Sequence, residues 1–426
     1  MADSKTNTLP HPASGSLPTG EAMLRWVTVR RRTASLWQSF FALATLISIV
    51  MLALLLYNVI NQSFGYVATL STVDPATLAI DGKPLQELSK EQLTGILEAH
   101  VSKGLMRRFE RDQPFAERSR ENVLDLVMER VVDLQIVKTW SLQESIFHRA
   151  QIEAEVAQDH PGATISFRSW ITPAFVSNPQ NSRADFAGVR TAILGSLWII
   201  LVTLLFGLPV GVGAAIYLEE YASDHWLNRL IKTNIDNLAG VPSIIYGMLG
   251  LAIFVRGIEP LTSGALFGLT DPTTANGRTI LSAGLTMGLL VLPLIIINAQ
   301  EAIRAVPSSL REAGYGLGAT KWQTIWAHVL PSAIPGILTG NILALSRAIG
   351  ETAPLVVVGA STFITVDPTG LFSKFTTLPV QIYQWTARPQ DEFRNIAAAA
   401  ILVLLILLLA LNASAVILRN RYSRQI

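Results

Sequence analysis

The chain reads PSSLREAGYGLGATKWQTIWAHVLP over residues 307–331, between two long apolar runs, Thr279–Ala299 and Ser332–Ala360. Each run has the roughly 20 predominantly apolar residues that a helix needs to cross about 30 Å of hydrocarbon. The stretch between them is polar. It is therefore predicted to be a loop outside the bilayer that joins two membrane spans.

Two short helices are predicted inside this loop. Ser309–Glu312 and Thr320–Gln323 both match a capping box, in which side chains satisfy the free backbone N–H groups of a first helical turn. Gly318 lies between them, where a left-handed or tightly turned backbone lets the chain reverse. Pro331 is expected to stop the second helix before the chain enters the membrane. Such a helix-turn-helix is suited to docking into a groove on a cytoplasmic partner.

The loop also carries a specific pattern, which consists of Glu312-Ala313-Gly314, Gly318 and Leu330-Pro331. This pattern resembles the coupling loop, or EAA loop, of binding-protein-dependent ABC importer permeases. Two positions depart from the usual form, since Gly314 stands where a second Ala is common and His328 where an aliphatic residue is common. The resemblance implies that Glu312 and its helix sit in the groove of an ATPase and pass the closure of that ATPase to the spans. The alternative interpretation is that Glu312 only caps a surface helix.

The sequence contains no Walker A pattern, so the chain is predicted to have no catalytic site of its own. ATP and Mg are expected to be bound by a separate ATPase subunit, and no cofactor is expected in this chain. No bound metal is predicted either. Histidines such as His225 and His328 have no carboxylate or histidine at the spacing of metal ligands.

The composition indicates an integral membrane protein. The 426 residues are 50% hydrophobic and 15% charged, whereas a soluble domain carries about a quarter charged residues. The net charge of +2, with basic residues spread along the chain, excludes a nucleic-acid binder. The absence of cysteine excludes a disulfide scaffold, a thiolate metal site and a cysteine nucleophile.

Six stretches are apolar and long enough to span the bilayer. They are Leu36–Ile60, Thr191–Leu218, Asn237–Val255, Thr279–Ala299, Ser332–Ala360 and Ile396–Leu418. The predicted fold class is therefore an all-α polytopic membrane protein with six transmembrane helices. Arginines before the first stretch and after the last favour cytoplasmic N- and C-termini, and an even number of spans satisfies both ends.

These spans divide the chain into regions. Residues 1–35 are expected to be a disordered cytoplasmic leader, because their first part is rich in Pro, Ser, Gly and Thr. The first transmembrane helix is predicted over 36–60, and its apolar run is longer than a signal-peptide core. An extracytoplasmic, periplasmic insert domain is predicted over 61–187, and a five-helix permease core over 188–422, with the cytoplasmic coupling loop at 300–331.

The insert is predicted to be α+β. Glu121–Gln158 has apolar residues at helical spacing, which predicts an amphipathic helix, and Ala163–Val176 alternates like a strand. Both patterns are interpreted as core-forming faces rather than binding surfaces.

Arg347 and Glu351 are charged residues inside the fifth span, four residues apart and predicted to pair on one helical face. A charge at the bilayer centre costs about 3 kcal/mol on insertion scales, so such residues usually face a bundle interior or a water-filled path. One interpretation is that Arg347 binds a tetrahedral oxyanion through its fork of donors while Glu351 holds it. The other is a structural ion pair that keeps two helices in register.

LSRAIGETAP, residues 345–354, resembles the fifth span of phosphate importer permeases, in particular the PstA-type subunit, which its Thr-Ala-Pro ending favours. Further similar stretches are Gly211–Tyr221, Gly240–Ser243 and Tyr246-Gly247. The resemblance, which extends over residues 186–420, implies the type I ABC importer permease fold. It places Arg347, Glu351 and Thr352 on the substrate pathway.

The resemblance also implies a function and partners. The chain would be the transmembrane permease subunit of an ATP-driven importer of inorganic phosphate, forming half of the pathway by alternating access. Its partners would be the sister permease PstC in a heterodimer, a PstB ATPase dimer and the periplasmic phosphate-binding protein PstS. The expected location is the lipid bilayer of the cell inner membrane, with several passes and no nucleic-acid partner.

Two alternatives stay open at this point. The first is a permease for another oxyanion, molybdate or sulfate, because the coupling loop is shared across importers. The second is a secondary transporter, which would need repeated halves and an ion-coupling site of its own. The sequence shows no duplicated half, and the cytoplasmic loop would have no role there.

Overall fold

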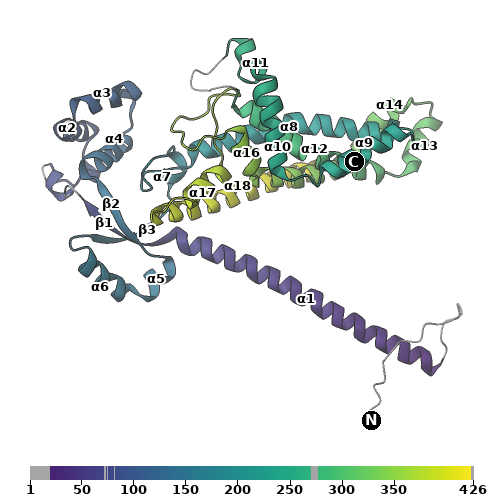
Figure 1. The fold of residues 1–426 in the computed structure, drawn as a ribbon, viewed down its shortest axis with the longest axis horizontal. Helices are drawn as coiled ribbons and strands as arrows, with labels where there is room; N and C mark the ends of the chain where they lie inside the picture. The colour runs from purple at the N-terminus through teal and green to yellow at the C-terminus, as the bar shows by residue number, and fades with distance from the viewer. Residues whose placement is uncertain (1–19, 72, 74, 81, 270–276, 424–426) are drawn as a thin grey trace. The chain divides into compact units, whose positions relative to one another are not determined.

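The structure is a computed structural model that describes residues 20–71, 73, 75–80, 82–269 and 277–423 (Figure 1). The chain divides into two units at the end of its first helix, between Asn58 and Val59. Each unit is described by itself.

Helix α1 (Glu21–Ser63) belongs to the first unit up to Asn58, and it carries the first predicted span, Leu36–Ile60. Its segment Trp26–Ser63 is apolar and long enough to cross a membrane, and α1 contains neither Gly nor Pro that would interrupt it. Residues 21–35 of the expected disordered leader are helical, so that part of the prediction is wrong. Residues 1–19 of the leader lie outside the described residues.

The insert contains an antiparallel sheet that has three strands within the described residues. The strand order is β2 (Leu134–Thr139), β1 (Phe64–Ser71) and β3 (Thr164–Ser169). Val67 of the central strand lies opposite Thr139 of β2 and Ser166 of β3. The strand predicted within Ala163–Val176 is thus confirmed over β3.

The single helix predicted over Glu121–Gln158 is wrong. The chain there forms α4 (Arg120–Val127), a π-helical turn, β2, α5 (Leu142–Phe147) and α6 (Arg149–Asp159). The interruption comes at Asp133, whose left-handed backbone has a φ of 45°, and the β-branched residues that follow favour a strand. The apolar spacing that suggested one helix therefore belongs to several short elements.

The other helices of the insert are α2 (Lys90–His100), α3 (Lys103–Asp112) and α7 (Pro173–Ser177). Helices α2 and α4 form a core with buried Leu93, Leu97, Val123 and Val127, as expected for core-forming faces. A second hydrophobic cluster joins the insert to the rest of the unit, because it contains both Phe175 of α7 and Trp385 of α17 (Leu378–Thr386).

One buried side chain ties the end of the insert to a distant loop. Gln180 is 2% exposed, and its Nε2 donates to the carbonyl of Thr362 at 3.0 Å. Its Oε1 accepts from the backbone N–H of Ile364, also at 3.0 Å. Both polar atoms of the amide are therefore hydrogen-bonded to one short stretch of backbone.

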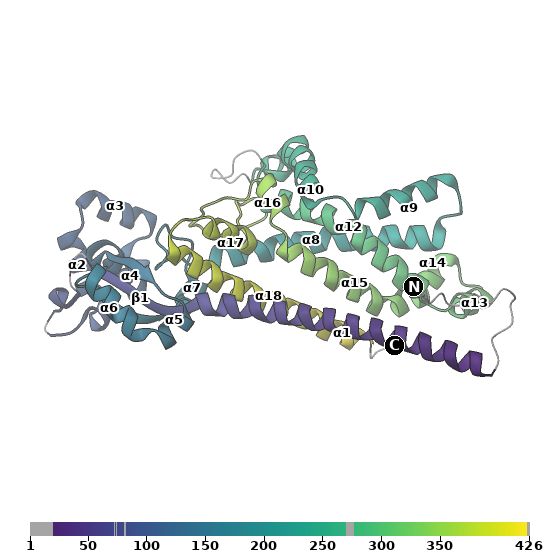
Figure 2. The same ribbon diagram turned by 60° about the horizontal axis from the view of Figure 1, so that its bottom comes forward.

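The permease core is a bundle of long helices, α8 (Arg190–Ile216), α12 (Ile280–Arg304), α15 (Leu330–Gly350) and α18 (Asp391–Ser423). Helix α12 packs between α8 and α15, and α15 packs against α18 (Figure 2). Small residues allow the close approach of α8 and α12. A Cβ at Gly284 would lie only 2.4 Å from the Cβ of Val202.

Among the described residues, five helices are apolar and long enough to cross a membrane, and a bent pair of helices is a sixth candidate. The third span predicted over Asn237–Val255 falls on this bent pair, whose second part is Ser243–Gly257. The chain is broken between α9 (Trp226–Leu238) and α10 (Ser243–Gly250), and the two parts meet at 109°. Pro242 stands at the break, where it cannot donate a helical hydrogen bond.

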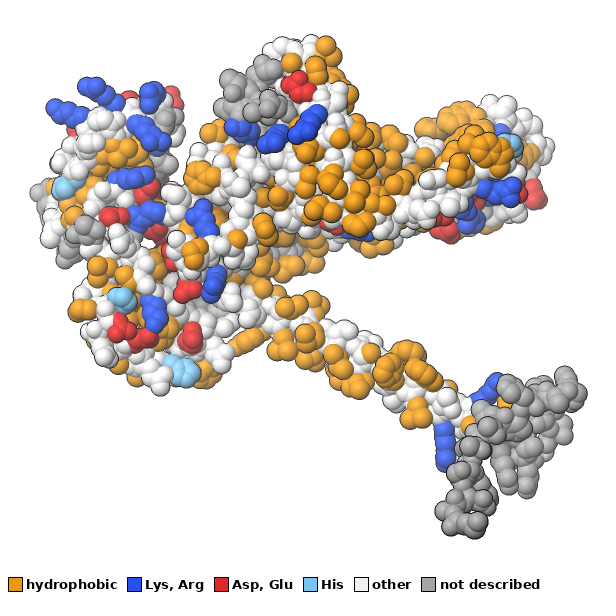
Figure 3. Space-filling model, viewed as in Figure 1, with side chains coloured by type: hydrophobic (Ala, Val, Ile, Leu, Met, Phe, Trp, Pro, Cys, Tyr) orange, Lys and Arg blue, Asp and Glu red, His pale blue; other side chains and the backbone are white. Residues whose placement is uncertain are grey.

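The bent pair presents hydrophobic side chains to its surroundings. Trp226 and Leu230 of α9 and Ile244 and Met248 of α10 are all exposed. Figure 3 shows hydrophobic side chains gathered over this part of the molecule. An apolar exterior of this kind suits contact with lipid or with another membrane subunit.

The remaining helices are α11 (Glu259–Thr262), α13 (Ser308–Gly316), α14 (Lys321–Thr324) and α16 (Ala353–Val358). The predicted fold class is confirmed: the chain is a helical polytopic membrane protein with an α+β insert after the first span. The limits of the insert at 61 and 187 stay predictions.

Candidate functional site

The loop between the fourth and fifth spans forms the predicted helical hairpin, here called the coupling hairpin (residues 308–329). Gly318 has a φ of 79° and makes the turn between α13 and α14. The capping box at Thr320–Gln323 is confirmed, because the Thr320 N–H donates to Gln323 Oε1 at 2.9 Å and Thr320 Oγ1 accepts from Gln323 N–H. The box at Ser309–Glu312 is wrong, since α13 already begins at Ser308 after Pro307.

The second helix of the hairpin does not stop at Pro331. Helix α14 continues through a π-helical turn, Ile325–Val329, into α15, so that Lys321–Gly350 runs as one long helix. Pro331 follows directly after this π-helical turn, so its missing N–H falls where the α-helical hydrogen-bond pattern already changes. Leu330 packs at the base of the hairpin beside Val329 and Ala333.

Gly314 is buried where the two hairpin helices meet. A Cβ at this position would lie 2.8 Å from Oγ1 and 2.9 Å from Cγ2 of Thr324 in α14. The glycine at the position of the common second Ala thus has a steric cause, because the Thr324 side chain occupies the space that an alanine Cβ would need.

Glu312 and Ala313 point outward. Both are exposed, and among the described residues the Glu312 side chain has no hydrogen bond or ion pair. Leu317 is 88% exposed at the tip, and the exposed rings of Trp322 and Trp326 stack with their centroids 5.5 Å apart. Exposed apolar and aromatic side chains gathered on one hairpin are typical of a protein-docking surface. The N-cap of α13 is Pro307, with no side-chain cap hydrogen bond, so Glu312 does not cap this helix.

The fifth span is broken at its charged pair. Helix α15 ends at Gly350, Glu351 has an extended backbone (φ -76°, ψ 126°), and α16 starts at Ala353. Pro354 explains the break, because in a continuous helix its nitrogen would have to donate to the carbonyl of Gly350. Arg347 Nε lies 3.5 Å from Glu351 Oε1, so the two residues pair as predicted. The prediction of a shared helical face is wrong, since Glu351 lies beyond the end of α15.

The arginine of this pair is accessible. The side chains of Arg347 and Glu351 are 47% and 21% exposed, so a guanidinium and a carboxylate stand at an opening in the helical backbone. Thr352 follows them, and its carbonyl accepts from Val356 N–H at 3.1 Å. The three residues predicted for the substrate pathway are therefore brought together at one break.

Helix α10 supports this break. Its Gly247 lies against α16, where a Cβ would be 2.7 Å from the Cα of Pro354. Tyr246 is 3% exposed, and its hydroxyl donates to the carbonyl of Leu238 at 2.6 Å across the bend between α9 and α10. The stretches that carried the family resemblance in the third span thus form the contact with the broken fifth span.

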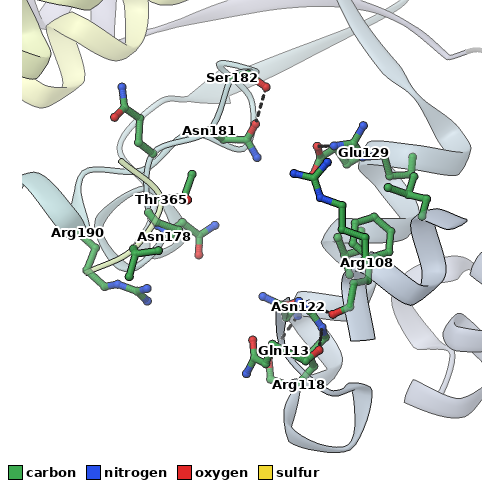
Figure 4. A pocket seen from close by; sticks show the side chains of 18 of the residues that line it. Arg108, Gln113, Arg118, Asn122, Glu129, Asn178, Asn181, Ser182, Arg190 and Thr365 are labelled. Atoms are coloured by element: carbon green, nitrogen blue, oxygen red, sulfur yellow. Dashed lines mark hydrogen bonds and ion pairs between the residues drawn. The ribbon is translucent and has the colours of Figure 1, made fainter. Parts of the chain in front are cut away.

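A polar cleft of about 1120 Å³ lies between the insert and the permease core (Figure 4). Arg108 and Asn122 come from the insert helices, and Asn178, Asn181 and Thr365 face them from the other side. None of the residues predicted for the substrate pathway or for the coupling loop lines this cleft.

The charged side chains that line this cleft are four arginines, Arg108, Arg118, Arg130 and Arg190, and two glutamates, Glu117 and Glu129. Arg130 lies 2.9 Å from Glu129, and Arg190 Nε lies 2.8 Å from Asp367 Oδ2. Burial raises the pKa of the nearby Asp125 carboxyl, and the charges of Glu129 and Glu121 raise it further. The lining therefore carries more cationic than anionic side chains, although Arg130 and Arg190 each pair with a carboxylate of the chain.

Sequence reasoning missed two carboxylates. Arg311, the residue before Glu312, pairs with Glu220, whose Oε1 is 2.7 Å from Arg311 Nη2. The neighbouring Glu219 pairs with Arg304. A signal was present, because these two acidic residues end an otherwise uncharged span.

An apolar helical bundle with an accessible ion pair at a broken span, and with an outward-facing hairpin between two spans, defines an integral membrane permease. The family model described as "Binding-protein-dependent transport system inner membrane component" matches residues 207–424, half of the chain. The chain belongs to this family. The family supports an importer permease over the secondary transporter considered above.

Two relatives are similar over most of their own length. The chain is 32% identical over 255 residues to the probable ABC transporter permease protein YqgI of Bacillus subtilis, covering 57% of this chain and 81% of the relative. It is 34% identical over 252 residues to the phosphate transport system permease protein PstA of Yersinia pestis, covering 59% and 76%. Among solved structures, an inward-facing MetNI methionine ABC transporter matches with a TM-score of 0.41 and 20% identity, over 55% of this chain and 95% of the other.

Proposed function

We propose that this chain is the PstA-type permease subunit of an ATP-driven importer of inorganic phosphate. It forms one half of the translocation pathway and alternates between inward-facing and outward-facing states. The observation that carries the proposal is the Arg347–Glu351 pair at the break of the fifth span, 3.5 Å apart and partly exposed inside an otherwise apolar segment.

The chemistry of the pair supports an oxyanion as the substrate. A guanidinium presents donors in a planar fork that matches the oxygens of a phosphate group, and the bond is strengthened by charge. Glu351 holds Arg347 until the anion arrives and keeps its charge from standing alone in an apolar segment. Relatives at 34% and 36% identity bear the name of phosphate transport permeases, in Yersinia pestis and Mycobacterium tuberculosis.

The coupling hairpin supports a separate ATPase as the energy source. Its exposed Glu312, Leu317 and tryptophans form a surface without a partner inside the described chain, and the sequence has no Walker A pattern. The proposed partners are a PstC-type sister permease, a PstB-type ATPase dimer that binds ATP and Mg, and a PstS-type phosphate-binding protein. In this arrangement both termini lie in the cytoplasm.

The test is uptake of labelled phosphate at limiting concentration, by cells that have this chain, lack it, or carry Arg347→Ala. Loss of one charge-assisted hydrogen bond is expected to lower uptake about tenfold or more. Uptake by Arg347→Lys is expected to lie between that of the natural chain and that of Arg347→Ala, because lysine keeps the charge but lacks the planar fork of donors. Arg394→Ala is the matched control, since Arg394 also forms an ion pair with a neighbour on its helix, Asp391 at 3.4 Å, but lies far along the chain from the break.

Sulfate and molybdate are added as competitors in the same assay. Loss of uptake in the deletion and in Arg347→Ala, without competition, supports the proposal. Unchanged phosphate uptake in the deletion, with other routes removed, overturns the phosphate assignment. If sulfate or molybdate competes instead, the importer class stands and the substrate is that oxyanion.

A further inference from the structure

Three consecutive residues end the second span, and each of them contacts a cationic side chain of a different helix. Glu219, Glu220 and Tyr221 belong to a π-helical turn, Tyr217–Tyr221, that continues α8 without interruption. Their partners are Arg304 at the end of α12, Arg311 in α13 and Lys321 at the start of α14. A π-helical turn, which occurs often at functional sites, thus places three neighbouring residues against the end of α12 and against the two hairpin helices, α13 and α14.

The Glu220 contact is the more buried of the two ion pairs. Both Nε and Nη2 of Arg311 donate to Glu220 Oε1, at 3.0 and 2.7 Å. Arg311 also donates to the carbonyls of Val306 and Ile303, at 2.7 and 2.9 Å, at the end of α12. The side chains of Glu220 and Arg311 are 6% and 19% exposed. One arginine thus joins the end of the second span, the end of the fourth span and the first hairpin helix.

The Glu219 contact is a bidentate pair. Arg304 Nε and Nη2 donate to Glu219 Oε1 and Oε2, both at 2.9 Å, in the parallel arrangement that fixes geometry as well as distance. The ammonium of Lys321 lies 5.1 Å from the ring centroid of Tyr221. The lysine contact ties the hairpin to the end of α8, and the bidentate pair ties the end of α8 to the end of α12, 85 residues further along the chain.

We propose that Glu219 and Glu220 are positioning residues that make the end of α8 move together with the coupling hairpin. The inference rests on the proposed function, in which an ATPase displaces the hairpin. The chain itself connects the hairpin only to α12 and α15. Helix α8 already packs on α12. The Glu220–Arg311 pair adds a direct contact between the end of α8 and the hairpin, and the Glu219–Arg304 pair fixes the same end of α8 to the end of α12, from which the hairpin starts. One displacement of the hairpin then reaches the second, fourth and fifth spans as a rigid body.

The first experiment uses the Glu219–Arg304 pair, because Arg304 donates only to carboxylates and its charge can be exchanged. Glu219→Arg and Arg304→Glu each place like charges together, and the double variant restores an opposite pair. Each variant is reconstituted with its ATPase, sister permease and binding protein in proteoliposomes. Phosphate uptake and ATP hydrolysis are measured in parallel.

Both single variants are expected to keep their ATPase bound and hydrolysing but to move about three to thirty times less phosphate per ATP. The double variant is expected to recover most of the loss. Asp224→Arg and Arg229→Glu are the matched controls, since Asp224 and Arg229 form an exposed ion pair, 3.5 Å apart, in the same inter-span segment without touching the hairpin. A normal ratio of uptake to hydrolysis in both single variants overturns the proposal, as does loss that the exchange does not restore.

A second measurement does not depend on the substrate. The natural chain has no cysteine, so spin labels can be placed at Ser223→Cys and Ser308→Cys, both exposed. The distance between the labels is expected to stay constant with and without ATP, and to broaden or shift in Glu219→Arg. A distance that changes with ATP in the otherwise unaltered chain overturns the rigid unit. If that chain imports no phosphate, the proposed function fails, while this measurement still decides whether the end of α8 and the hairpin move together.

Discussion

Gly314 shows how a single missing methyl group shapes the coupling hairpin. Its hydrogen atom faces Thr324 across the contact between α13 and α14, and the Oγ1 of Thr324 has no hydrogen-bond partner among the described residues. Only one of the two positions, 314 or 324, can therefore carry a side chain in the space between the helices.

Gly314→Ala is expected to weaken docking of the ATPase. The new Cβ meets Thr324 at 2.8 Å, and overpacking of this kind costs about 1–3 kcal/mol. If all of this cost is expressed in docking, the affinity falls by about 5-fold to 150-fold. The measurement is the affinity of the purified ATPase subunit for the detergent-solubilised permease.

Gly316→Ala is the control, because a Cβ at Gly316 meets nothing within 4 Å. Combining Gly314→Ala with Thr324→Ala is expected to restore affinity, since it removes both clashing atoms. Equal affinity of Gly314→Ala and the natural chain would contradict the steric account.

At the scale of elements, α10 packs against the broken fifth span. Pro354 breaks the span after Gly350, and α10 packs onto the short helix that follows through Gly247. A second glycine of α10, Gly250, faces Thr286 of α12, where a Cβ would lie 2.1 Å from Oγ1. Helix α10 is thus wedged between α12 and the segment that follows the charged pair.

Gly247→Ala is expected to reduce phosphate uptake while leaving ATPase docking unchanged. The added Cβ would meet two backbone atoms, the Cα of Pro354 at 2.7 Å and its carbonyl oxygen at 3.0 Å, and neither can rotate away. We expect about 1–3 kcal/mol of strain next to Glu351 and about a tenfold loss of uptake.

The control is Gly213→Ala on α8, since a Cβ at Gly213 meets nothing within 4 Å. Normal uptake by Gly247→Ala at normal expression would show that this contact does not position the broken span. Loss of ATPase docking would show instead that the substitution disturbs the whole bundle.

The charged pair marks the limit of reasoning from spacing. Arg347 and Glu351 stand four residues apart, which predicts a shared helical face, and they do pair at 3.5 Å. Pro354 was the available sign that the helix stops before Glu351, because it denies Gly350 its hydrogen bond. Glu219 and Glu220 could not be matched to Arg304 and Arg311 from sequence, since the partners are set by how distant helices pack.

For the whole molecule, composition and hydropathy were sufficient to predict a polytopic helical protein. They identified where the apolar helices lie but missed the 109° bend of the third, because hydropathy averages over a window and does not register direction. The insert was predicted less well. Its helices and strands are short, and each has too few residues for a periodic pattern to stand out.

The orientation of the chain across the membrane can be tested with single cysteines. Ala99→Cys in the insert and Ser308→Cys in the coupling hairpin both occupy exposed positions of a chain without natural cysteine. A membrane-impermeant maleimide is expected to label the first in intact spheroplasts and the second only after lysis. Labelling of Ser308→Cys in intact spheroplasts would place the hairpin on the outer side and remove the basis for an ATPase partner.

The amide of Gln180, satisfied on both sides by the backbone of Thr362 and Ile364, makes the insert hard to transplant. A chimera in which a shorter relative receives only residues 61–187 would bring the glutamine without its complementary loop, and a buried amide would be orphaned. The buried position of Gln180 therefore depends on the loop after α16 as well as on the insert. Any chimera between members of this family should therefore transfer two segments together, the insert and the loop after α16.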